Sequence, residues 1–282
     1  MNSEAILRDS KMKIRWQEIF TRTIPFTNES DVVWRGVNQL IMRAKSPSTQ
    51  VDQAWLPRSS DLNWYPYLEM LNDVEVIRQL MEAEKDGCDA AIIGCYCDPG
   101  LREARGVLNI PVVGLSEAAM MFAQTLGGRF ACVTVWESYV PIIERNLRLC
   151  GWESRAISIR PVRYFNIEWS KLVGAFKGDG CPLIKDFERV ALSCVEDGAD
   201  VVIAGCGYLA PALSLCGYSH VAETKVPVVD CVATGVAMAE AVALLYRHMG
   251  VLPSRGKTSP YPHPPHKKLS AICERFGLNN VL

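Results

Sequence analysis

The chain has 282 residues, of which 49% are hydrophobic and 22% charged, and its 30 basic residues nearly balance its 31 acidic ones. The formal net charge of −1 gives no support to binding of nucleic acid or of an anionic membrane surface. The sequence contains no apolar run long enough to predict a membrane-spanning helix, and residues 1–13 lack the apolar core of a secretory signal, so a cytoplasmic protein is expected.

The first predicted elements are a strand over residues 14–20 and a helix over 30–44, which Ser46-Pro47-Ser48 ends. A second helix is predicted over residues 73–85, and a turn then leads into a short apolar strand over 89–94. Short apolar runs continue to alternate with helical patterns as far as residue 250. This alternation is typical of an α/β fold with a mainly parallel sheet.

An internal repeat is the most informative feature of the sequence. Six of ten positions are identical between residues 86–95 and 197–206, which read DGCDAAIIGC and DGADVVIAGC. Farther along, residues 110–119 and 226–235 are also similar, and read IPVVGLSEAA and VPVVDCVATG. Each copy therefore predicts one α/β lobe, and the two lobes would place equivalent residues on opposite walls of a shared cleft.

The repeat singles out two of the eleven cysteines, Cys95 and Cys206, because both follow a glycine at a predicted strand end. Ligands of open parallel sheets bind beyond the carboxyl ends of the strands. Asp98 suits the N-cap and Pro99 the first position of a helix after Cys95, so unpaired helical N–H groups would lower the pKa of that thiol. Gly207 would let the backbone approach a ligand closely.

Two thiols that face one carbon from opposite sides suit a racemase or epimerase. One thiolate would remove the proton next to a carbonyl, and the opposite thiol would deliver a proton to the other face. This reaction inverts the carbon without a cofactor.

The motifs around both cysteines resemble those of hydantoin racemases, in the aspartate/glutamate/hydantoin racemase superfamily. The resemblance rests on residues 94–104, 110–120, 197–209 and 226–230, which read GCYCDPGLREA, IPVVGLSEAAM, DGADVVIAGCGYL and VPVVD. It implies two Rossmann-like lobes related by a pseudo-twofold axis, each a mainly parallel sheet flanked by helices, with one catalytic cysteine per lobe. We expect Cys95 in a lobe of residues 14–116 and 228–250, Cys206 in a lobe of residues 117–227, and a C-terminal extension over residues 251–282.

The resemblance also indicates substrate-binding residues. Thr134 ends a strand that in the family lies near the substrate. The residues next to the two cysteines are further candidates, namely Tyr96, Cys97, Gly207 and Tyr208. The sequence departs from the family at residues 14–18, where IRWQE replaces an Asn-Pro-Asn-Thr strand end, and Gln17 is the candidate replacement for its amide. Cys97 stands where the family more often has glycine.

No metal or cofactor is expected. Cys95 and Cys97 lack the second cysteine pair of a structural zinc site, and no glycine-rich nucleotide motif follows a strand. The expected partners are a small-molecule substrate and further copies of the chain, with the proline-rich tail around His263 as a surface segment or oligomer arm.

Three alternatives remain open on the sequence alone. A maleate-type cis–trans isomerase or an arylmalonate-type decarboxylase uses the same framework. A two-lobed binding protein without catalysis would explain the repeat but would not need reactive thiols.

Overall fold

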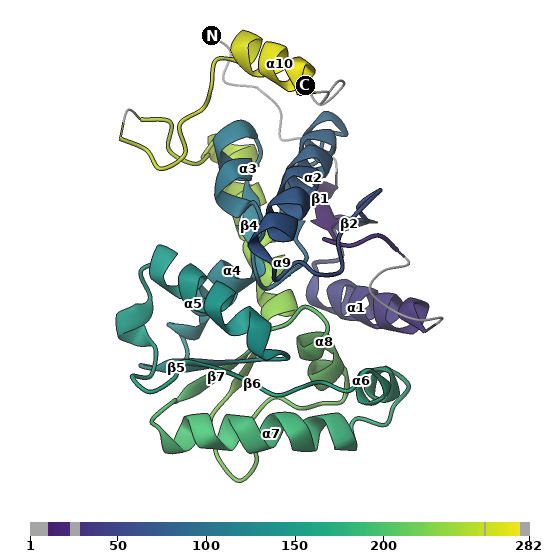
Figure 1. The fold of residues 1–282 in the computed structure, drawn as a ribbon, viewed down its shortest axis with the longest axis vertical. Helices are drawn as coiled ribbons and strands as arrows, with labels where there is room; N and C mark the ends of the chain where they lie inside the picture. Colours follow the sequence, from purple (N-terminus) through teal and green to yellow (C-terminus); the bar gives the residue numbers. More distant parts are fainter. Residues whose placement is uncertain (1–10, 23–28, 257, 277–282) are drawn as a thin grey trace.

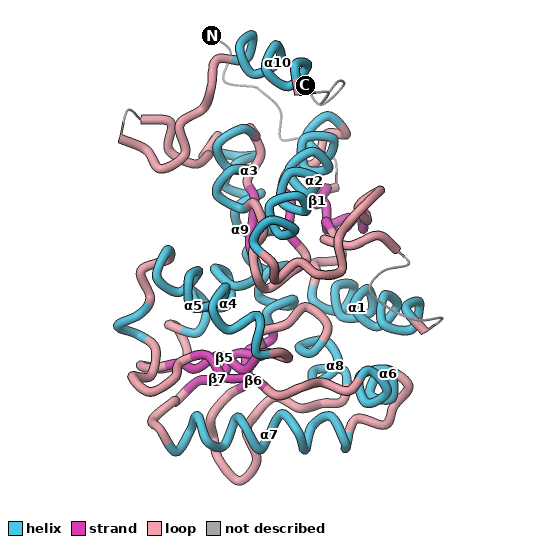
Figure 2. The backbone as a smooth tube through the Cα atoms, in the orientation of Figure 1, coloured by secondary structure: helices cyan, strands magenta, loops and turns pink. Residues whose placement is uncertain are grey.

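A computed structural model describes residues 11–22, 29–256 and 258–276 (Figure 1). The polar N-terminal residues 1–10 and the last six residues of the predicted extension lie outside the described part. The strands form two separate four-stranded sheets, one in each lobe, which appear as two groups of strands in Figure 2.

All neighbouring strands are parallel, and the two sheets have the same topology. The first sheet has the order β2-β1-β3-β4 and the second β6-β5-β7-β8. The strands are β1 (Met12–Gln17), β2 (Thr49–Ala54), β3 (Ala90–Ile93), β4 (Val112–Gly114), β5 (Phe130–Thr134), β6 (Val162–Tyr164), β7 (Val201–Ala204) and β8 (Val228–Asp230). The repeated motifs therefore occupy matching strands, β3 with β7 and β4 with β8. The predicted pair of pseudo-twofold-related α/β lobes is confirmed.

Helices cover the sheets and connect successive strands. The α-helices are α1 (Ser30–Ala44), α2 (Pro66–Lys85), α3 (Leu101–Val107), α4 (Leu115–Ala123), α5 (Val140–Leu149), α6 (Trp169–Phe176), α7 (Cys181–Glu196), α8 (Leu209–Leu215), α9 (Cys231–Met249) and α10 (His266–Arg275), and two 3₁₀ turns are η1 (Glu137–Tyr139) and η2 (Glu153–Arg155). None of the described helices is both long and apolar enough to cross a membrane.

Two helices cross between the lobes and join them. Helix α4 follows β4 of the first sheet but contacts β7, β8 and α5 of the second lobe. Helix α9 follows β8 of the second sheet but contacts β1, β3 and β4 of the first, and it packs along α4. This reciprocal exchange of helices explains why one hydrophobic core extends through both lobes.

The predicted lobe boundary at residue 228 differs from the structure. Strand β8 pairs with β7, so residues 228–230 lie in the second sheet, and only the helix that follows them packs on the first. This placement follows from the internal repeat, because β8 pairs with β7 in the second sheet as β4 pairs with β3 in the first. We propose two lobes that exchange their last helices, followed by the extension.

The apolar residues of β3 show why this strand lies at the centre of its lobe. Ala90 and Ile92 join the core shared with the second lobe, whereas Ala91 and Ile93 face the opposite side of the sheet, toward α2 and α3. All four are fully buried. Successive strand residues point to opposite faces, so a parallel sheet covered on both sides requires an uninterrupted apolar run.

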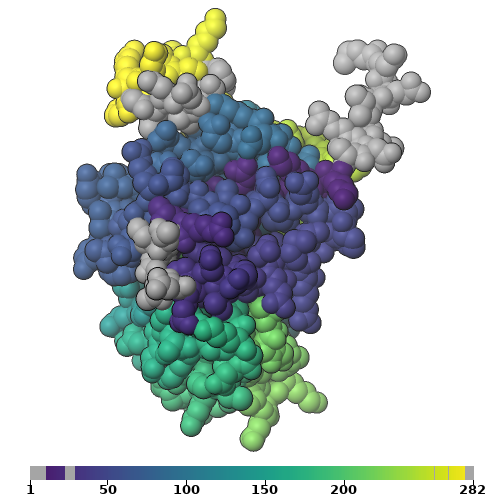
Figure 3. All heavy atoms as spheres, turned by 90° about the vertical axis from the view of Figure 1, so that its right-hand side faces the viewer, coloured from purple at the N-terminus to yellow at the C-terminus, as the bar shows by residue number. Residues whose placement is uncertain are grey.

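The C-terminal extension lies against the first lobe, at the far end of the molecule from the second (Figures 1 and 3). The guanidinium of Arg255 donates hydrogen bonds to the carbonyl oxygens of Arg105 and Leu108, at the end of α3. The guanidinium of Arg105 in turn lies over the ring of Tyr261, with its carbon 5.7 Å from the ring centroid. The extension therefore holds the end of the helix that follows Cys95.

Candidate active site

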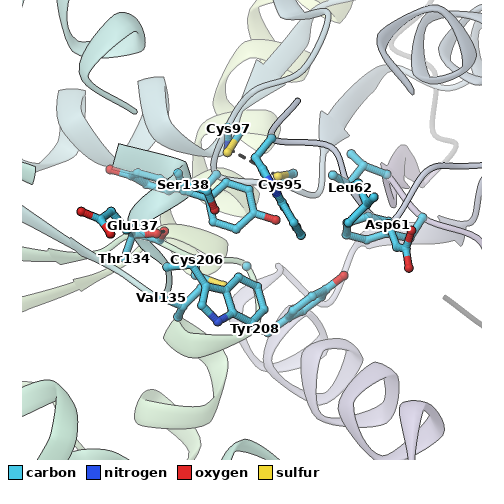
Figure 4. A pocket seen from close by; sticks show the side chains of 18 of the residues that line it. Asp61, Leu62, Cys95, Cys97, Thr134, Val135, Glu137, Ser138, Cys206 and Tyr208 are labelled. Carbon is cyan, nitrogen blue, oxygen red and sulfur yellow. Dashed lines mark hydrogen bonds between the residues drawn. The ribbon is translucent and has the colours of Figure 1, made fainter. Parts of the chain in front are cut away.

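Cys95 and Cys206 occupy equivalent places in the two lobes. Each follows a glycine directly after its central strand, Gly94 after β3 and Gly205 after β7. Both side chains are partly exposed and line the same cavity, whose volume is about 880 Å³. Figure 4 shows the two cysteines reaching this cavity from the ribbons of different lobes. The structure thus brings the two cysteines of the repeat to one small-molecule-sized space.

The turns that carry the two cysteines pack against each other. A Cβ atom on Gly207 would lie 3.0 Å from the carbonyl oxygen of Gly94, tighter than an ordinary contact. The hydroxyl of Thr134, at the end of β5, donates a 3.0 Å hydrogen bond to the carbonyl oxygen of Gly205 and fixes the turn before Cys206. A side chain at position 207 would therefore press the two turns apart by a few tenths of an ångström.

The surroundings of Cys206 favour a neutral thiol. Burial raises the pKa of Cys206 to about 11, although the backbone N–H groups of Leu209 and Tyr208 at the start of α8 act in the opposite direction. The cost of removing a thiolate from water therefore exceeds the stabilisation from the helix N–H groups. The start of α8 therefore lowers the pKa of Cys206 by less than burial raises it.

Cys95 lies in a different setting. The backbone N–H of Cys97 donates to the Cys95 sulfur at 3.4 Å. The Cys97 thiol is itself buried, and its pKa is raised well above the ordinary value by the adjacent Cys95 sulfur and by burial. The side-chain amide of Asn146 on α5 donates to the Cys97 carbonyl oxygen at 2.8 Å, so the second lobe holds the turn that carries Cys95.

Asp98 ties the turn that carries Cys95 to the start of α4 by hydrogen bonds. Its carboxylate accepts hydrogen bonds from the backbone N–H groups of Ser116 and Glu117, both at 3.0 Å, and from the hydroxyl of Ser116. Burial raises the pKa of Asp98 to about 6, and these hydrogen bonds limit the rise. The prediction that Asp98 caps the helix after Cys95 is wrong, because α3 begins only at Leu101 after Gly100. Asp98 instead binds the first N–H groups of α4, the helix that crosses to the other lobe.

The chain is similar to known proteins over most of its length. The family model described as Asp/Glu/Hydantoin racemase matches residues 33–239. The chain belongs to this family. A hydantoin racemase from Pseudomonas sp. (strain NS671) is 31% identical over 215 residues, which are 76% of this chain and 80% of the relative. A hydantoin racemase from Rhizobium meliloti is 33% identical over 67% of this chain and 72% of its own. The chain is therefore a racemase, an enzyme of the isomerase class.

Solved structures with similar folds cover nearly the whole racemase. An allantoin racemase from Klebsiella pneumoniae superposes with a TM-score of 0.72 at 23% identity, covering 94% of this chain and 98% of that one. An allantoin racemase from Pseudomonas fluorescens gives a TM-score of 0.69 at 26% identity, over 90% and 98% of the two chains. The two-lobed architecture is thus that of known racemases.

Five of the six predicted binding residues of the racemase line the cavity. They are Tyr96, Cys97, Thr134, Gly207 and Tyr208. Their roles differ, however. Tyr96 is almost completely buried, and its ring lies against Gly205, so it joins the lobes as well as closing the cavity. The Tyr208 ring packs edge-on against Trp34 of α1, with centroids 5.5 Å apart.

Gln17 does not reach the cavity wall. Its side chain is fully buried at the end of β1, where its amide nitrogen donates to the carbonyl oxygen of Glu18 at 3.0 Å. Glu18 is also buried and accepts hydrogen bonds from Trp16 and Gln53. The Gln17 amide therefore bonds to backbone carbonyl oxygens of the first lobe, while its own amide oxygen and one carboxylate oxygen of Glu18 are buried without a hydrogen-bond partner in the described part of the chain. The sequence pattern does not reveal this inward orientation.

Two segments that the sequence did not single out complete the cavity. Asp61, Leu62 and Trp64 come from the connection between β2 and α2, in the first lobe. Residues 136–139, which follow β5 in the second lobe, face them. The hydroxyl of Tyr139 donates to Asn63 at 2.9 Å and links the two segments. Of these residues, only Trp136 could have been expected near the cavity from the sequence, because it follows the strand that ends at Thr134.

The described wall of the cavity contains two acidic side chains and no basic one. Asp61 and Glu137 are both exposed at its edge, and no Lys, Arg or His is among the lining residues. In the described part of the chain, no three His, Cys, Asp or Glu side chains gather as metal ligands would. The groups available for chemistry are therefore the thiols of the three lining cysteines, the two carboxylates, a few hydroxyl and amide groups, and backbone N–H groups.

Proposed function

We propose that this racemase inverts a neutral cyclic ureide, such as a hydantoin, with Cys95 and Cys206 as paired acid and base. The observation that carries the proposal is that both sulfurs, equivalent by the internal repeat, are partly exposed to one cavity. A substrate between them presents one face of its reacting carbon to each lobe. General acid/base catalysis needs such groups within reach of the proton that they move.

The reaction consists of two proton transfers. One cysteine, as thiolate, takes the proton from the carbon next to the ring carbonyl, and the C–H electron pair moves into an enolate. The opposite cysteine, as thiol, donates its proton to the other face of that carbon and becomes the thiolate. The high pKa of Cys206 suits the donor, because at neutral pH the group carries its proton. The reverse reaction exchanges the two roles.

The charges of the cavity wall support a neutral substrate. Asp61 and Glu137 would repel a carboxylate, and no described lining residue offers a cation to pair with one. A hydantoin ring carries carbonyl and N–H groups but no carboxylate. The relatives named hydantoin racemase and the similar structures named allantoin racemase support the same class of substrate.

The same charges disfavour the related reactions on this framework. A maleate-type isomerase and an arylmalonate-type decarboxylase both act on dicarboxylates, which would meet two carboxylates at the cavity edge. A binding protein without catalysis would not require two exposed thiols at equivalent strand ends. The two-thiol racemase accounts for both observations.

Exchange of the α-hydrogen with solvent tests the proposal. Single enantiomers of several 5-substituted hydantoins and of allantoin are incubated with the enzyme in D₂O, with maleate and aspartate for comparison. Circular dichroism follows inversion, and proton NMR follows deuterium uptake at the reacting carbon. We expect inversion with deuterium uptake for at least one cyclic ureide, above the rate without enzyme.

Serine variants test the two cysteines separately. Cys95→Ser and Cys206→Ser should each abolish inversion, and either can retain exchange from one enantiomer, because one thiol still removes its proton. Cys181→Ser is the matched control, since this cysteine is exposed at the start of α7, away from the cavity. Full turnover in the double variant Cys95→Ser/Cys206→Ser, or no exchange with any cyclic ureide, would falsify the proposal.

A further inference from the structure

We infer that the substrate carries a neutral aromatic group on its reacting carbon, and that Trp64, Trp136, Tyr139 and Trp169 bind it. These four residues are called the aromatic chamber below. The inference rests on the proposed function and names the substituent that distinguishes one hydantoin from another.

The cavity is larger than a hydantoin ring requires. Its volume of about 880 Å³ is near the upper end of the range of about 300–1,000 Å³ for small-molecule sites. A single five-membered ring between Cys95 and Cys206 would leave most of this space to water. The remaining wall is dominated by the aromatic chamber, together with Phe20 and Leu62. A large apolar substituent would fill the space that the ring leaves.

Three rings of the chamber contact one another, and one of these contacts joins the two lobes. Trp64 and Tyr139 meet edge to face, with centroids 6.1 Å apart and planes at 88°. Trp136 and Tyr139 lie 5.8 Å apart at 40°. Because Trp64 belongs to the first lobe and Tyr139 to the second, the chamber forms only when the lobes are together. These are the distances at which aromatic pairs attract, so a further ring can join the cluster.

Tyr139 connects the chamber to the reacting end of the cavity. Its hydroxyl is fixed by the hydrogen bond to Asn63. Burial raises the pKa of Tyr139, and the nearby sulfurs of Cys97, Cys95 and Cys206 raise it further. The ring lines the same cavity as both proposed acid/base groups. A substituent on a carbon between the two sulfurs can therefore extend toward the chamber within this cavity.

The polarity of the wall selects against other substituents. The ureido group of allantoin has several N–H and carbonyl groups, each of which costs free energy when buried without a partner. The rings of the chamber offer few such partners, the two carboxylates lie at the exposed edge, and the Thr134 hydroxyl already donates to Gly205. An acidic substituent would meet Asp61 and Glu137. A neutral aromatic group requires no polar partner and avoids this repulsion.

The first test compares three substrates of the wild-type enzyme. They share the hydantoin ring and differ only in the substituent: 5-benzylhydantoin, 5-methylhydantoin and allantoin. Burying a phenyl ring predicts that kcat/KM for the benzyl compound exceeds that for the methyl compound by about 10- to 100-fold. Allantoin should be poorer than the benzyl compound by a similar factor.

The second test changes the chamber. Trp136→Leu and Trp64→Leu should each lower the ratio of kcat/KM for the benzyl over the methyl compound by about 3- to 30-fold. Trp152→Leu is the matched control, because Trp152 packs against the core of the second lobe and does not line the cavity. The ratio is the readout, so partial loss of folded enzyme in a variant cancels from it.

The outcomes separate this inference from the proposed function. Turnover of allantoin or 5-methylhydantoin as fast as that of 5-benzylhydantoin would overturn the aromatic substituent and leave the two-thiol reaction intact. An unchanged ratio in both tryptophan variants would overturn the chamber. Absence of α-hydrogen exchange with all three compounds would instead remove the proposed function.

Discussion

The α-carbon of Gly207 lies against the carbonyl oxygen of Gly94, and a methyl group at position 207 would approach that oxygen to 3.0 Å. This contact joins the two strand-end turns that carry Cys95 and Cys206. The distance between the two sulfurs therefore depends on the absence of a side chain at residue 207. Neither atom of the contact belongs to a thiol, so it can be altered without changing the chemistry of either cysteine.

Gly207→Ala should reduce kcat/KM for inversion by at least about tenfold, because a displacement of about 1 Å between reacting groups can cost 100-fold in rate. It should also lower the free energy of unfolding by about 1–3 kcal/mol through overpacking. Gly106→Ala on α3 is the matched control, since its Cβ would have only an ordinary 3.8 Å contact. Equal activity of the two variants would show that the turns tolerate separation.

Asp98→Asn should lower both stability and activity. The amide can accept hydrogen bonds with only one oxygen, so at least one donor among Ser116 and Glu117 loses its partner, at a cost of about 1–3 kcal/mol. The turn from Cys95 to Asp98 would shift, which the rate of Cys95 alkylation by iodoacetamide measures apart from turnover. Asp200→Asn is the control, because Asp200 likewise accepts from two backbone N–H groups, those of Gly128 and Arg129, but does not belong to the turn that carries Cys95.

Alkylation of Cys206 should rise steeply with pH. Its pKa of about 11 means that the thiol is protonated at neutral pH, and iodoacetamide reacts with the thiolate. Below that pKa the thiolate fraction, and hence the alkylation rate, should rise about tenfold per pH unit. Mass spectrometry of the peptide that contains Cys206 follows the reaction, and Cys206→Ser identifies the peptide. A rate that levels off below about pH 9 would contradict the raised pKa.

Glu18 should make the enzyme less stable as pH rises toward 7. Burial raises its pKa from 4.5 to about 7, and hydrogen bonds from Trp16 and Gln53 limit the rise. Because the folded protein holds the proton more tightly than the unfolded chain, this stabilisation is full below about pH 4.5. The contribution of Glu18 to the free energy of unfolding then decreases by up to about 1.4 kcal/mol per pH unit as pH rises to 7.

Glu18→Gln removes that titration, so chemical denaturation between pH 5 and 8 should show a smaller decrease in unfolding free energy for the variant. Asp73 and Asp98, whose pKa values are raised to about 7 and about 6, contribute the decrease that remains. If the free energy of unfolding changes with pH equally in wild type and Glu18→Gln, the raised pKa of Glu18 is contradicted.

The repeat allowed the two lobes and the position of both cysteines to be predicted. Each copy contains a buried four-residue strand followed by Gly-Cys, and parallel-sheet geometry then places the cysteine at the ligand-binding edge. The helix over residues 30–44 was also predicted with the bounds that the structure has, because its apolar face, which includes Val33 and Val37, has a clear helical period. These features depend on local sequence.

The remaining features depend on contacts between distant residues. Nothing near Trp64 indicates that it meets Tyr139, because that contact requires both lobes to be in place. The role of Asp98 was misassigned for the same reason, since its partners belong to the helix that crosses to the other lobe. Gln17 occupies a strand end, where a polar side chain can face either a ligand or the protein interior.

The unlike surroundings of Cys95 and Cys206 have a kinetic consequence that does not depend on the substrate. Mirror-image reactants have equal free energy in water, so the equilibrium constant of racemisation is one and kcat/KM must be the same in both directions. A difference in pKa or in hydrogen bonding between the two thiols therefore cannot enrich either enantiomer. Their difference can appear only as parallel changes in kcat and KM, with one enantiomer bound more tightly and converted more slowly.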